Sequence, residues 1–252
     1  VYSFHVKNNG EHLSAFYYVG GSLGVTLAGD FLTLFIFWEI MAFSSVFLIW
    51  YRNIPSSVDS GFRYLLWHVV GGLILFSGIM LHYSESGDLS IQYLPFHGWW
   101  PTDISSLGYF LIMIGFILNA AVPPFGAWLP DSYPAATVTG AVFMSAFTTK
   151  TAVYALIRVC AGSEILIVLG VIMAIYGVVY AVLENDARRL LAYHIISQVG
   201  YMVAGTGLGT QMAINGVVAH AFCHILYKSL LFMGTGSVLY VTGTAKLSEL
   251  GG

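Results

Sequence analysis

The chain has 252 residues, of which 58% are hydrophobic and 8% are charged, with a mean hydropathy of +0.80 and a formal net charge of −3. A soluble domain carries about a quarter charged residues, so this composition excludes one and indicates a polytopic α-helical membrane protein. The long continuous apolar runs exclude a β-barrel, whose strands alternate over roughly ten residues. The negative net charge gives no basis for nucleic-acid binding.

Both cysteines, Cys160 and Cys223, lie in apolar runs. Two isolated cysteines can form neither a disulfide framework nor an iron–sulfur cluster, so we expect no redox centre, cofactor or metal in this chain. The sequence begins at Val1 without a methionine and ends at Gly252 soon after an apolar segment. We therefore expect a piece of a longer protein.

Eight stretches are long and apolar enough to cross a bilayer, which takes about 20 residues of helix. They cover approximately residues 13–29, 31–51, 62–83, 107–127, 139–160, 165–183, 190–208 and 213–240. The fourth contains Pro123 and Pro124, and proline cannot continue an ordinary helix because it lacks the N–H group and clashes with the preceding turn. Broken helices at membrane depth recur at transport sites, so we expect a functional break here; the alternative is a plain proline kink.

The charges between the spans fall into two groups. One side carries the cations Lys7, Arg52, Arg63, Arg188, Arg189 and Lys246, and the other carries Arg158 with the acids Glu85, Asp88, Asp103 and Glu164. The positive-inside rule places the first group in the cytoplasm. The loop 84–106 is then expected outside the membrane.

Three residues that carry charge lie in the middle of spans: Glu39, Lys150 and Lys228. A charge at the bilayer centre costs roughly 2.5–3.5 kcal/mol on insertion scales, so such residues mark ion or proton pathways. The alternative is a set of structural polar contacts between helices. A nearby lysine would favour the charged form of Glu39 and couple the two titrations, but the sequence does not show which lysine it meets.

The last span carries His220, His224 and Lys228 at i, i+4 and i+8. At about 100° per residue these positions drift by only about 40° per step, so they form one polar stripe. Histidine titrates near physiological pH, and such a stripe can pass protons. Zinc binding by the two histidines is the competing interpretation, but no carboxylate completes a ligand set at that depth.

Other polar residues in the spans give weaker signals. His68 and His194 could lie on a proton path, although a single intramembrane histidine is often a hydrogen bond between helices. Asp30, Asp131 and Asp186 are expected at span ends, where a carboxylate caps a helix N-terminus.

Five segments resemble motifs of the proton-translocating antiporter-like membrane subunits. They are Asp30-FLTLFIFWE, Pro124-FGAWLPDSYPAATVTG, Phe147-TTKTAVYALIRV, Asn185-DARRLLAYHIISQVGYM and His220-AFCHILYKSLLF. The family includes subunits of respiratory complex I, of membrane-bound hydrogenases and of Mrp-type multisubunit sodium/proton antiporters. The segment around His194 and the stretch TVTGAVFMSAFTTK are most similar to the D-type subunits of Mrp antiporters.

The resemblance implies a single antiporter-like transmembrane domain built from two inverted five-helix repeats, each with one broken helix. Residues 13–160 would form the first repeat, and residues 165–252 would begin the second.

The resemblance also implies roles for particular residues. Glu39 matches the family's essential glutamate, and Lys150 matches the lysine of the helix after the broken one. His220, His224 and Lys228 match the central polar axis that links the repeats. One match fails, because the position five residues before Pro124, where family members usually carry a lysine, is Asn119. Either Lys150 takes over the partner role, or this half-channel is not a conventional pump.

The resemblance thus implies a proton-conducting subunit of a multisubunit Na⁺/H⁺ antiporter in a bacterial inner membrane, with other membrane subunits as partners. A first alternative is a proton-pumping subunit of an NADH:quinone oxidoreductase or a membrane-bound hydrogenase, again without a redox centre in this chain. A second alternative, suggested by Asn119, is a structural subunit that has lost transport.

Overall fold

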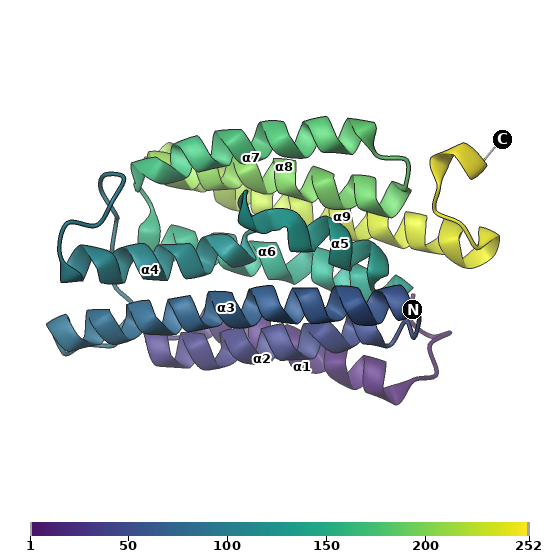
Figure 1. Ribbon diagram of the computed structural model, residues 1–252, viewed down its shortest axis with the longest axis horizontal. Helices are drawn as coiled ribbons and strands as arrows, with labels where there is room; N and C mark the ends of the chain where they lie inside the picture. Colours follow the sequence, from purple (N-terminus) through teal and green to yellow (C-terminus); the bar gives the residue numbers. More distant parts are fainter. Residues whose placement is uncertain (1, 251–252) are drawn as a thin grey trace.

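The computed structural model describes residues 2–250, and its elements are helices that run along one common direction (Figure 1). In chain order they are α1 (Asn9–Leu27), α2 (Phe31–Trp50), α3 (Pro55–Ser86), α4 (Ile104–Asn119), η1 (Phe125–Ala127), α5 (Trp128–Ala135), α6 (Val138–Cys160), α7 (Glu164–Leu183), α8 (Ala187–Leu208), α9 (Gln211–Thr242) and η2 (Leu247–Glu249). The predicted all-α fold with one broken span is confirmed, since α4 and α5 are the two halves of the fourth span.

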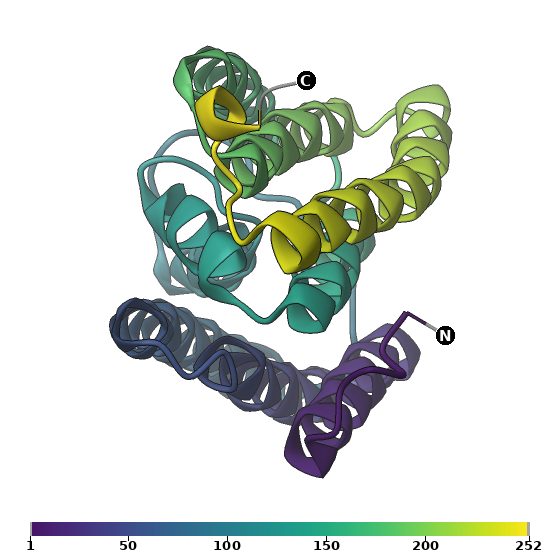
Figure 2. The same ribbon diagram turned by 90° about the vertical axis from the view of Figure 1, so that its right-hand side faces the viewer.

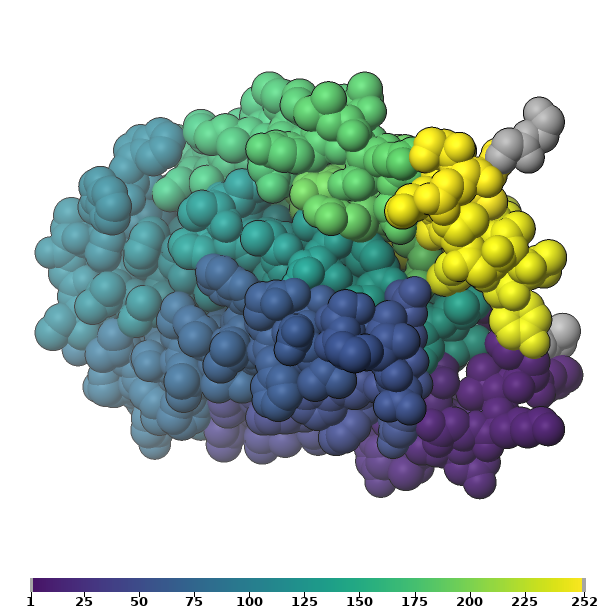
Figure 3. All heavy atoms as spheres, turned by 45° about the vertical axis from the view of Figure 1, so that its right-hand side comes forward, coloured from purple at the N-terminus to yellow at the C-terminus, as the bar shows by residue number. Residues whose placement is uncertain are grey.

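The helices form layers that follow the chain (Figure 2). Helices α1 to α3 make one layer, α4 to α6 lie in the middle, and α7 to α9 cover the opposite face. The two described ends of the chain lie at the same end of the molecule (Figure 3). Middle helix α6 is therefore covered on both sides, which explains why Lys150 in its centre is only 5% exposed.

Five helices are long and apolar enough to cross a membrane by length and composition: α2, α3, α6, α7 and α9. Two of them carry broad apolar surface outward, since only 33% of the apolar window of α7 and 22% of that of α9 is buried inside the molecule. Apolar surface on this scale is stable when it faces lipid or other membrane helices. The chain is an integral membrane protein.

The predicted spans agree with the helices except at two places. Helix α3 begins at Pro55, well before the predicted residue 62, because proline suits the first helical turn, where its missing N–H would have no partner. The fourth span was predicted to end at residue 127, but a second half, α5, follows it. Pro130 and Pro134 obscured this short helix, since prolines in a sequence indicate helix ends.

The break between α4 and α5 begins with a regular helix ending. Ala121 N–H donates to Leu118 O at 3.1 Å and Val122 N–H donates to Ile117 O at 3.1 Å, which is the Schellman pattern. Ala121 adopts the left-handed conformation, with φ of 61°, at the position where glycine is usual. The indole of Trp128 then donates to Leu118 O at 3.1 Å. Protein groups therefore satisfy several of the backbone groups that the break would leave unpaired.

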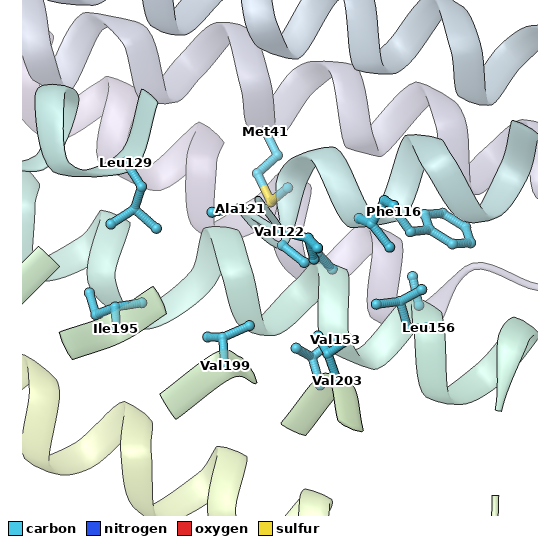
Figure 4. Packing of buried hydrophobic residues seen from close by; sticks show 14 of the residues in the cluster. Met41, Phe116, Ala121, Val122, Leu129, Val153, Leu156, Ile195, Val199 and Val203 are labelled. Atoms are coloured by element: carbon cyan, nitrogen blue, oxygen red, sulfur yellow. The ribbon is translucent and has the colours of Figure 1, made fainter. Parts of the chain in front are cut away.

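Apolar side chains from several layers surround the break (Figure 4). Ala121 and Val122 are fully buried between Met41 of α2 and Val153 of α6, with Val203 of α8 beyond them. The break lies at the centre of the hydrophobic core, so it is held by packing as well as by hydrogen bonds.

Two of the three predicted caps are confirmed. Asp30 accepts a hydrogen bond from Thr33 N at 2.7 Å at the start of α2, and these contacts hold the pKa of Asp30 below its usual value. Asp186 caps α8. Asp131 lies in the first turn of α5, as expected for a helix N-terminus, but it is not the cap, because Ala127 holds that position; Asp131 instead forms an ion pair with Arg63 at 2.7 Å.

The loop cations Arg52, Arg188 and Lys246 lie at one end of the molecule. Arg52 and Arg188 both donate to Pro134 O, and Lys246 pairs with Asp186 in an isolated β-bridge. This arrangement agrees with the predicted grouping of charges. We call this the inner end, and the end with the loop at residues 87–103 the outer end; that the inner end faces the cytoplasm stays a prediction.

Candidate functional site

A central cluster of titratable side chains forms where α6, α8 and α9 meet, and we call it the central cluster. Its members are Lys150 of α6, His194 of α8, and His220, His224 and Lys228 of α9. Lys150 is near enough to Lys228, His220 and His224 to interact with them electrostatically. The predicted stripe on α9 therefore faces the lysine of α6, which lies about 80 residues earlier in the chain.

The α9 stripe is anchored to α8 at both ends. His220 Nε2 lies 3.0 Å from Gln198 Oε1, to which a protonated Nε2 donates, and the hydroxyl of Tyr227 donates to the same oxygen at 3.3 Å. Lys228 Nζ donates to Leu191 O at 3.1 Å. Lys228 is completely buried, so this carbonyl offsets part of the cost of its charged form.

The histidines in the middle of the central cluster have unused ring nitrogens. His224 is fully buried, and neither of its ring nitrogens makes a hydrogen bond within residues 2–250. The same holds for Nδ1 of His194. His224 packs against the Tyr227 ring with centroids 5.0 Å apart. An imidazole within electrostatic reach of two lysines, with both nitrogens available, can accept or donate a proton through small side-chain movements.

Glu39 lies apart from the central cluster, on α2 against α3. Its Oε1 is buried and makes no hydrogen bond to the described residues. It lies 2.0 Å from the position that a Cβ atom would take on Gly72. The carboxylate therefore occupies space that only glycine at position 72 leaves open. On its other side Glu39 lines a groove of about 690 Å³ between α1 and α2.

Asn119 lies on the opposite side of the same glycine pair. Its Oδ1 is 3.8 Å from the position of a Cβ atom on Gly71, so Gly71 and Gly72 separate Asn119 from Glu39. Asn119 is 1% exposed, and its Nδ2 makes no hydrogen bond within the described part of the chain. That Lys150 takes over the partner role of the lysine missing at position 119 stays a prediction.

Glu39 and Lys150 do not form an ion pair in this structure. The ion pairs among residues 2–250 are Arg63–Asp131, Arg189–Glu184 and Lys246–Glu249, all near helix ends. Lys150 Nζ instead donates to Ser145 O of its own helix at 2.6 Å. Glu39 and the central cluster are thus two separate sites.

His68 of α3 lies in an aromatic setting. It stacks on Tyr64 with ring centroids 3.9 Å apart and meets Trp128 of α5 edge-on at 4.6 Å. One ring nitrogen contacts Tyr64 O at 2.9 Å, and Nε2 is buried without a partner among the described residues. The hydrogen bond of His68 is therefore within α3 and not between helices, and its second ring nitrogen remains available.

A group of buried hydroxyls links α1, α2, α3 and α6, and sequence reasoning missed it. Thr148 of α6 shares a hydrogen bond of 2.5 Å with Tyr18 of α1 and lies close to the hydroxyls of Tyr64 and Tyr133. Tyr64 in turn shares a hydrogen bond of 2.7 Å with Ser45 of α2. The signal in the sequence was weak, because tyrosine and threonine are common on apolar helices and only their convergence in space is distinctive.

Metal binding is not supported in the described part of the chain. No group of three His, Cys, Asp or Glu side chains there is placed to hold a metal ion. Cys160 is buried and Cys223 is exposed, and neither is in a disulfide.

Comparisons with known proteins show the family of this chain. Residues 28–252 match the family described as NADH:quinone oxidoreductase/Mrp antiporter, transmembrane. The chain belongs to this family. Within the family, it is 31% identical over 249 residues to the D-type Na(+)/H(+) antiporter subunit of Alkalihalophilus pseudofirmus, covering 94% of this chain and 50% of that protein. It is also 31% identical over 283 residues to the A1-type Na(+)/H(+) antiporter subunit of Staphylococcus aureus, covering 100% of this chain and 35% of that one.

Solved structures of family members show the same fold. A chain of the Mrp complex from Dietzia sp. superposes with a TM-score of 0.81 at 26% identity, over 88% of this chain and 44% of that one. A chain of the membrane-bound sulfane sulfur reductase, an archaeal respiratory membrane complex, superposes with a TM-score of 0.85 at 26% identity, over 94% and 51%. The chain therefore spans about half, or less, of the length of these relatives.

Proposed function

We propose that this chain is the proton-conducting part of a subunit of a multisubunit Na⁺/H⁺ antiporter in a bacterial inner membrane, with other membrane subunits as its partners. The central cluster carries this proposal, because it gathers two lysines and three histidines between α6, α8 and α9. Five ionisable groups inside a membrane protein are costly to bury, and such residues mark ion or proton pathways. The names of the relatives from Alkalihalophilus and Staphylococcus support Na⁺ and H⁺ as the transported ions.

The like charges of Lys150 and Lys228 suit the cluster to a relay. Two like charges within one buried cluster repel each other in general, so protonation of one lysine disfavours protonation of the other. His224 lies within electrostatic reach of both, with unused nitrogens, and can carry the proton between them. A proton that moves between Lys228 and Lys150 changes the charge first next to α8 and then on α6.

Glu39 supplies a second titrating position, at the groove between α1 and α2. Its unpartnered carboxylate oxygen can take up a proton without first breaking an ion pair. Family members usually carry a lysine on the broken helix, which pairs with the glutamate that Glu39 matches. Here Asn119 holds the position of that lysine, so a neutral amide stands where the positive charge would be. We further propose that α1 to α6 form the first inverted repeat and that α7 to α9 begin the second.

A second candidate function is proton pumping within a respiratory membrane complex. The superposition with the sulfane sulfur reductase chain favours it, with a TM-score of 0.85. Purification of the assembled complex separates the two functions. Copurifying subunits with iron–sulfur clusters would support the respiratory complex, and their absence together with Na⁺-dependent proton movement would support the antiporter.

The α9 stripe provides the first test of transport. We expect Lys228→Ala to lower Na⁺-driven proton movement in inverted vesicles at least about tenfold, because the relay loses a titrating group. His220→Ala and His224→Ala are expected to have smaller effects, since water can bridge a missing histidine. Lys246→Ala is the control, because that lysine lies in an exposed ion pair outside the cluster. Full activity of Lys228→Ala at normal protein levels would contradict the proposal.

A further inference from the structure

His68 lies between two places where polar side chains of α2 meet α3. One helical turn before it, the hydroxyl of Tyr64 shares a hydrogen bond of 2.7 Å with Ser45. One turn after it, Gly72 leaves the space that the Glu39 carboxylate occupies. These three positions of α3 are four residues apart, so they share one face of the helix and follow one another at about 6 Å. His68 is therefore one helical turn from the Glu39 site and one turn from the group of buried hydroxyls.

Both halves of the broken helix reach the same part of α3. Trp128 of α5 meets the ring of His68 edge-on, with centroids 4.6 Å apart, and its indole N–H donates to Leu118 O at 3.1 Å. Asn119, the next residue of α4, faces Gly71, three positions after His68. The contacts of Trp128 and Gly71 therefore hold Asn119 and His68, each 1% exposed, near each other.

The hydrogen bond of His68 determines which ring nitrogen can take up a proton. Its Nδ1 lies 2.9 Å from Tyr64 O, and a carbonyl oxygen only accepts, so the neutral ring carries its proton on Nδ1. Nε2 then has a free lone pair, and it is buried without a partner among the described residues. The amide nitrogen of Asn119 is a buried donor that also makes no hydrogen bond within residues 2–250. The lone pair of Nε2 can thus accept a hydrogen bond from this amide or take up a proton from an acid.

We propose that His68 supplies the titratable group that the broken helix lacks at position 119, and that it carries a proton between Glu39 and the buried hydroxyls. This role rests on the proposed transport function. In the uptake step, the O–H bond of the protonated Glu39 carboxyl breaks and an N–H bond forms at Nε2 of His68. The products are a carboxylate and an imidazolium, which attract each other. Side-chain rotation or one bridging water covers the turn of helix between them.

The surroundings of His68 suit a ring that gains and loses a proton. The Tyr64 ring stacks on it with centroids 3.9 Å apart, and the face of an aromatic ring attracts a cation. The proton then leaves to a hydroxyl of the buried group, which passes its own proton on, and the imidazole returns to its neutral form. Thr148 belongs to these hydroxyls and lies on α6, the helix that carries Lys150. The route thus ends at the helix of the lysine in the central cluster.

Rescue by a lysine at position 119 tests this role. We expect His68→Gln to lower proton movement in proteoliposomes with the assembled complex at least about tenfold, since an amide cannot take up a proton. Adding Asn119→Lys to His68→Gln is expected to restore transport to within about twofold of the wild-type rate, because it returns a titratable group to the broken helix. His82→Gln is the matched control and should transport normally. His82 is also a buried histidine of α3 whose Nε2 has no partner among the described residues, but it lies near the outer end.

Two driving forces separate the role of His68 from the proposed function. Proton movement is measured with a Na⁺ gradient and, independently, with an imposed membrane potential. Normal rates in His68→Gln would overturn the role of His68, as would a loss that Asn119→Lys does not restore, because that pattern shows a structural histidine. A wild-type complex that moves protons only under the membrane potential would overturn Na⁺/H⁺ exchange, and the rates of the variants would still decide for or against His68. A wild-type complex that moves protons under neither force would overturn both.

Discussion

Gly71 and Gly72 separate the two polar residues Glu39 and Asn119, and each glycine faces one of them. The distances differ sharply. A Cβ atom on Gly72 would lie 2.0 Å from Glu39 Oε1, whereas a Cβ atom on Gly71 would lie 3.4 Å from Leu118 Cβ and 3.8 Å from Asn119 Oδ1. Glycine at position 72 is therefore part of the Glu39 site, while glycine at position 71 serves ordinary packing.

This difference predicts that alanine at position 72 lowers transport strongly, whereas alanine at position 71 changes it little. Gly72→Ala is expected to displace the Glu39 carboxylate and to lower transport to the level of Glu39→Gln, a loss of at least about tenfold. Gly71→Ala should keep most of the activity, because its contacts stay within ordinary van der Waals distances. Proton movement in inverted vesicles at matched protein levels checks this. Equal activity of the two variants would show that the position of the carboxylate is unimportant.

At the scale of single residues, the sequence predicted the charged positions well and their partners poorly. Glu39, Lys150 and Lys228 could be identified because charge within a long apolar run is rare and costly. That Lys150 meets α9 rather than Glu39 depends on how distant helices pack, which periodicity does not encode. The hydroxyls around Thr148 were missed for the same reason, since no single tyrosine or threonine in a span is unusual.

The C-terminal end of helix α5 accepts hydrogen bonds from side chains of several other elements. Arg188 is 1% exposed, and its guanidinium donates to the carbonyls of Pro134 at 3.0 Å, Ala136 at 3.1 Å and Thr137 at 3.2 Å. Arg52 also donates to Pro134 O, and Ser57 donates to Ala135 O at 2.7 Å. Cations suit this position, because the carbonyls at a helix C-terminus carry partial negative charge. Arg188 thereby ties α8 to the second half of the broken helix.

We expect Arg188→Ala to destabilise the protein by at least about 2 kcal/mol, since each buried carbonyl left without a donor costs about 1–3 kcal/mol. Arg189→Ala is the matched control, because Arg189 lies in a partly exposed ion pair with Glu184 and such pairs contribute about 0–1 kcal/mol. The loss of folded, monodisperse protein on heating in detergent measures the difference. Equal melting of both variants would show that the carbonyl contacts of Arg188 do not stabilise the junction.

The helices themselves were largely predictable, because long apolar runs and their flanking charges determine the spans. Helix α5 was the exception. Its eight residues include Pro130 and Pro134, and what holds its end in place is a set of side chains from α3, α8 and the loop after α2. Local sequence gives no sign of such distant donors.

Across the whole molecule, the titratable groups form two separate sites. The Glu39 site borders a groove between α1 and α2, and Lys150 of the central cluster borders a pocket between α1, α6 and α9. The sequence could predict the family that the chain belongs to, while the roles of the residues in both sites stay predictions. The separation of the two sites follows from the three layers of helices, which is a property of the tertiary structure.

The central claim is that protons pass through Lys150, with Asn119 as an uncharged position beside the path. The most direct test measures Na⁺-driven proton movement of Lys150→Ala, Asn119→Ala and Asn119→Lys in proteoliposomes that contain the assembled complex. We expect Lys150→Ala to abolish the signal, Asn119→Ala to reduce it, and Asn119→Lys to remain active, since family members usually carry a lysine at this position. Wild-type transport rates in Lys150→Ala would contradict the account.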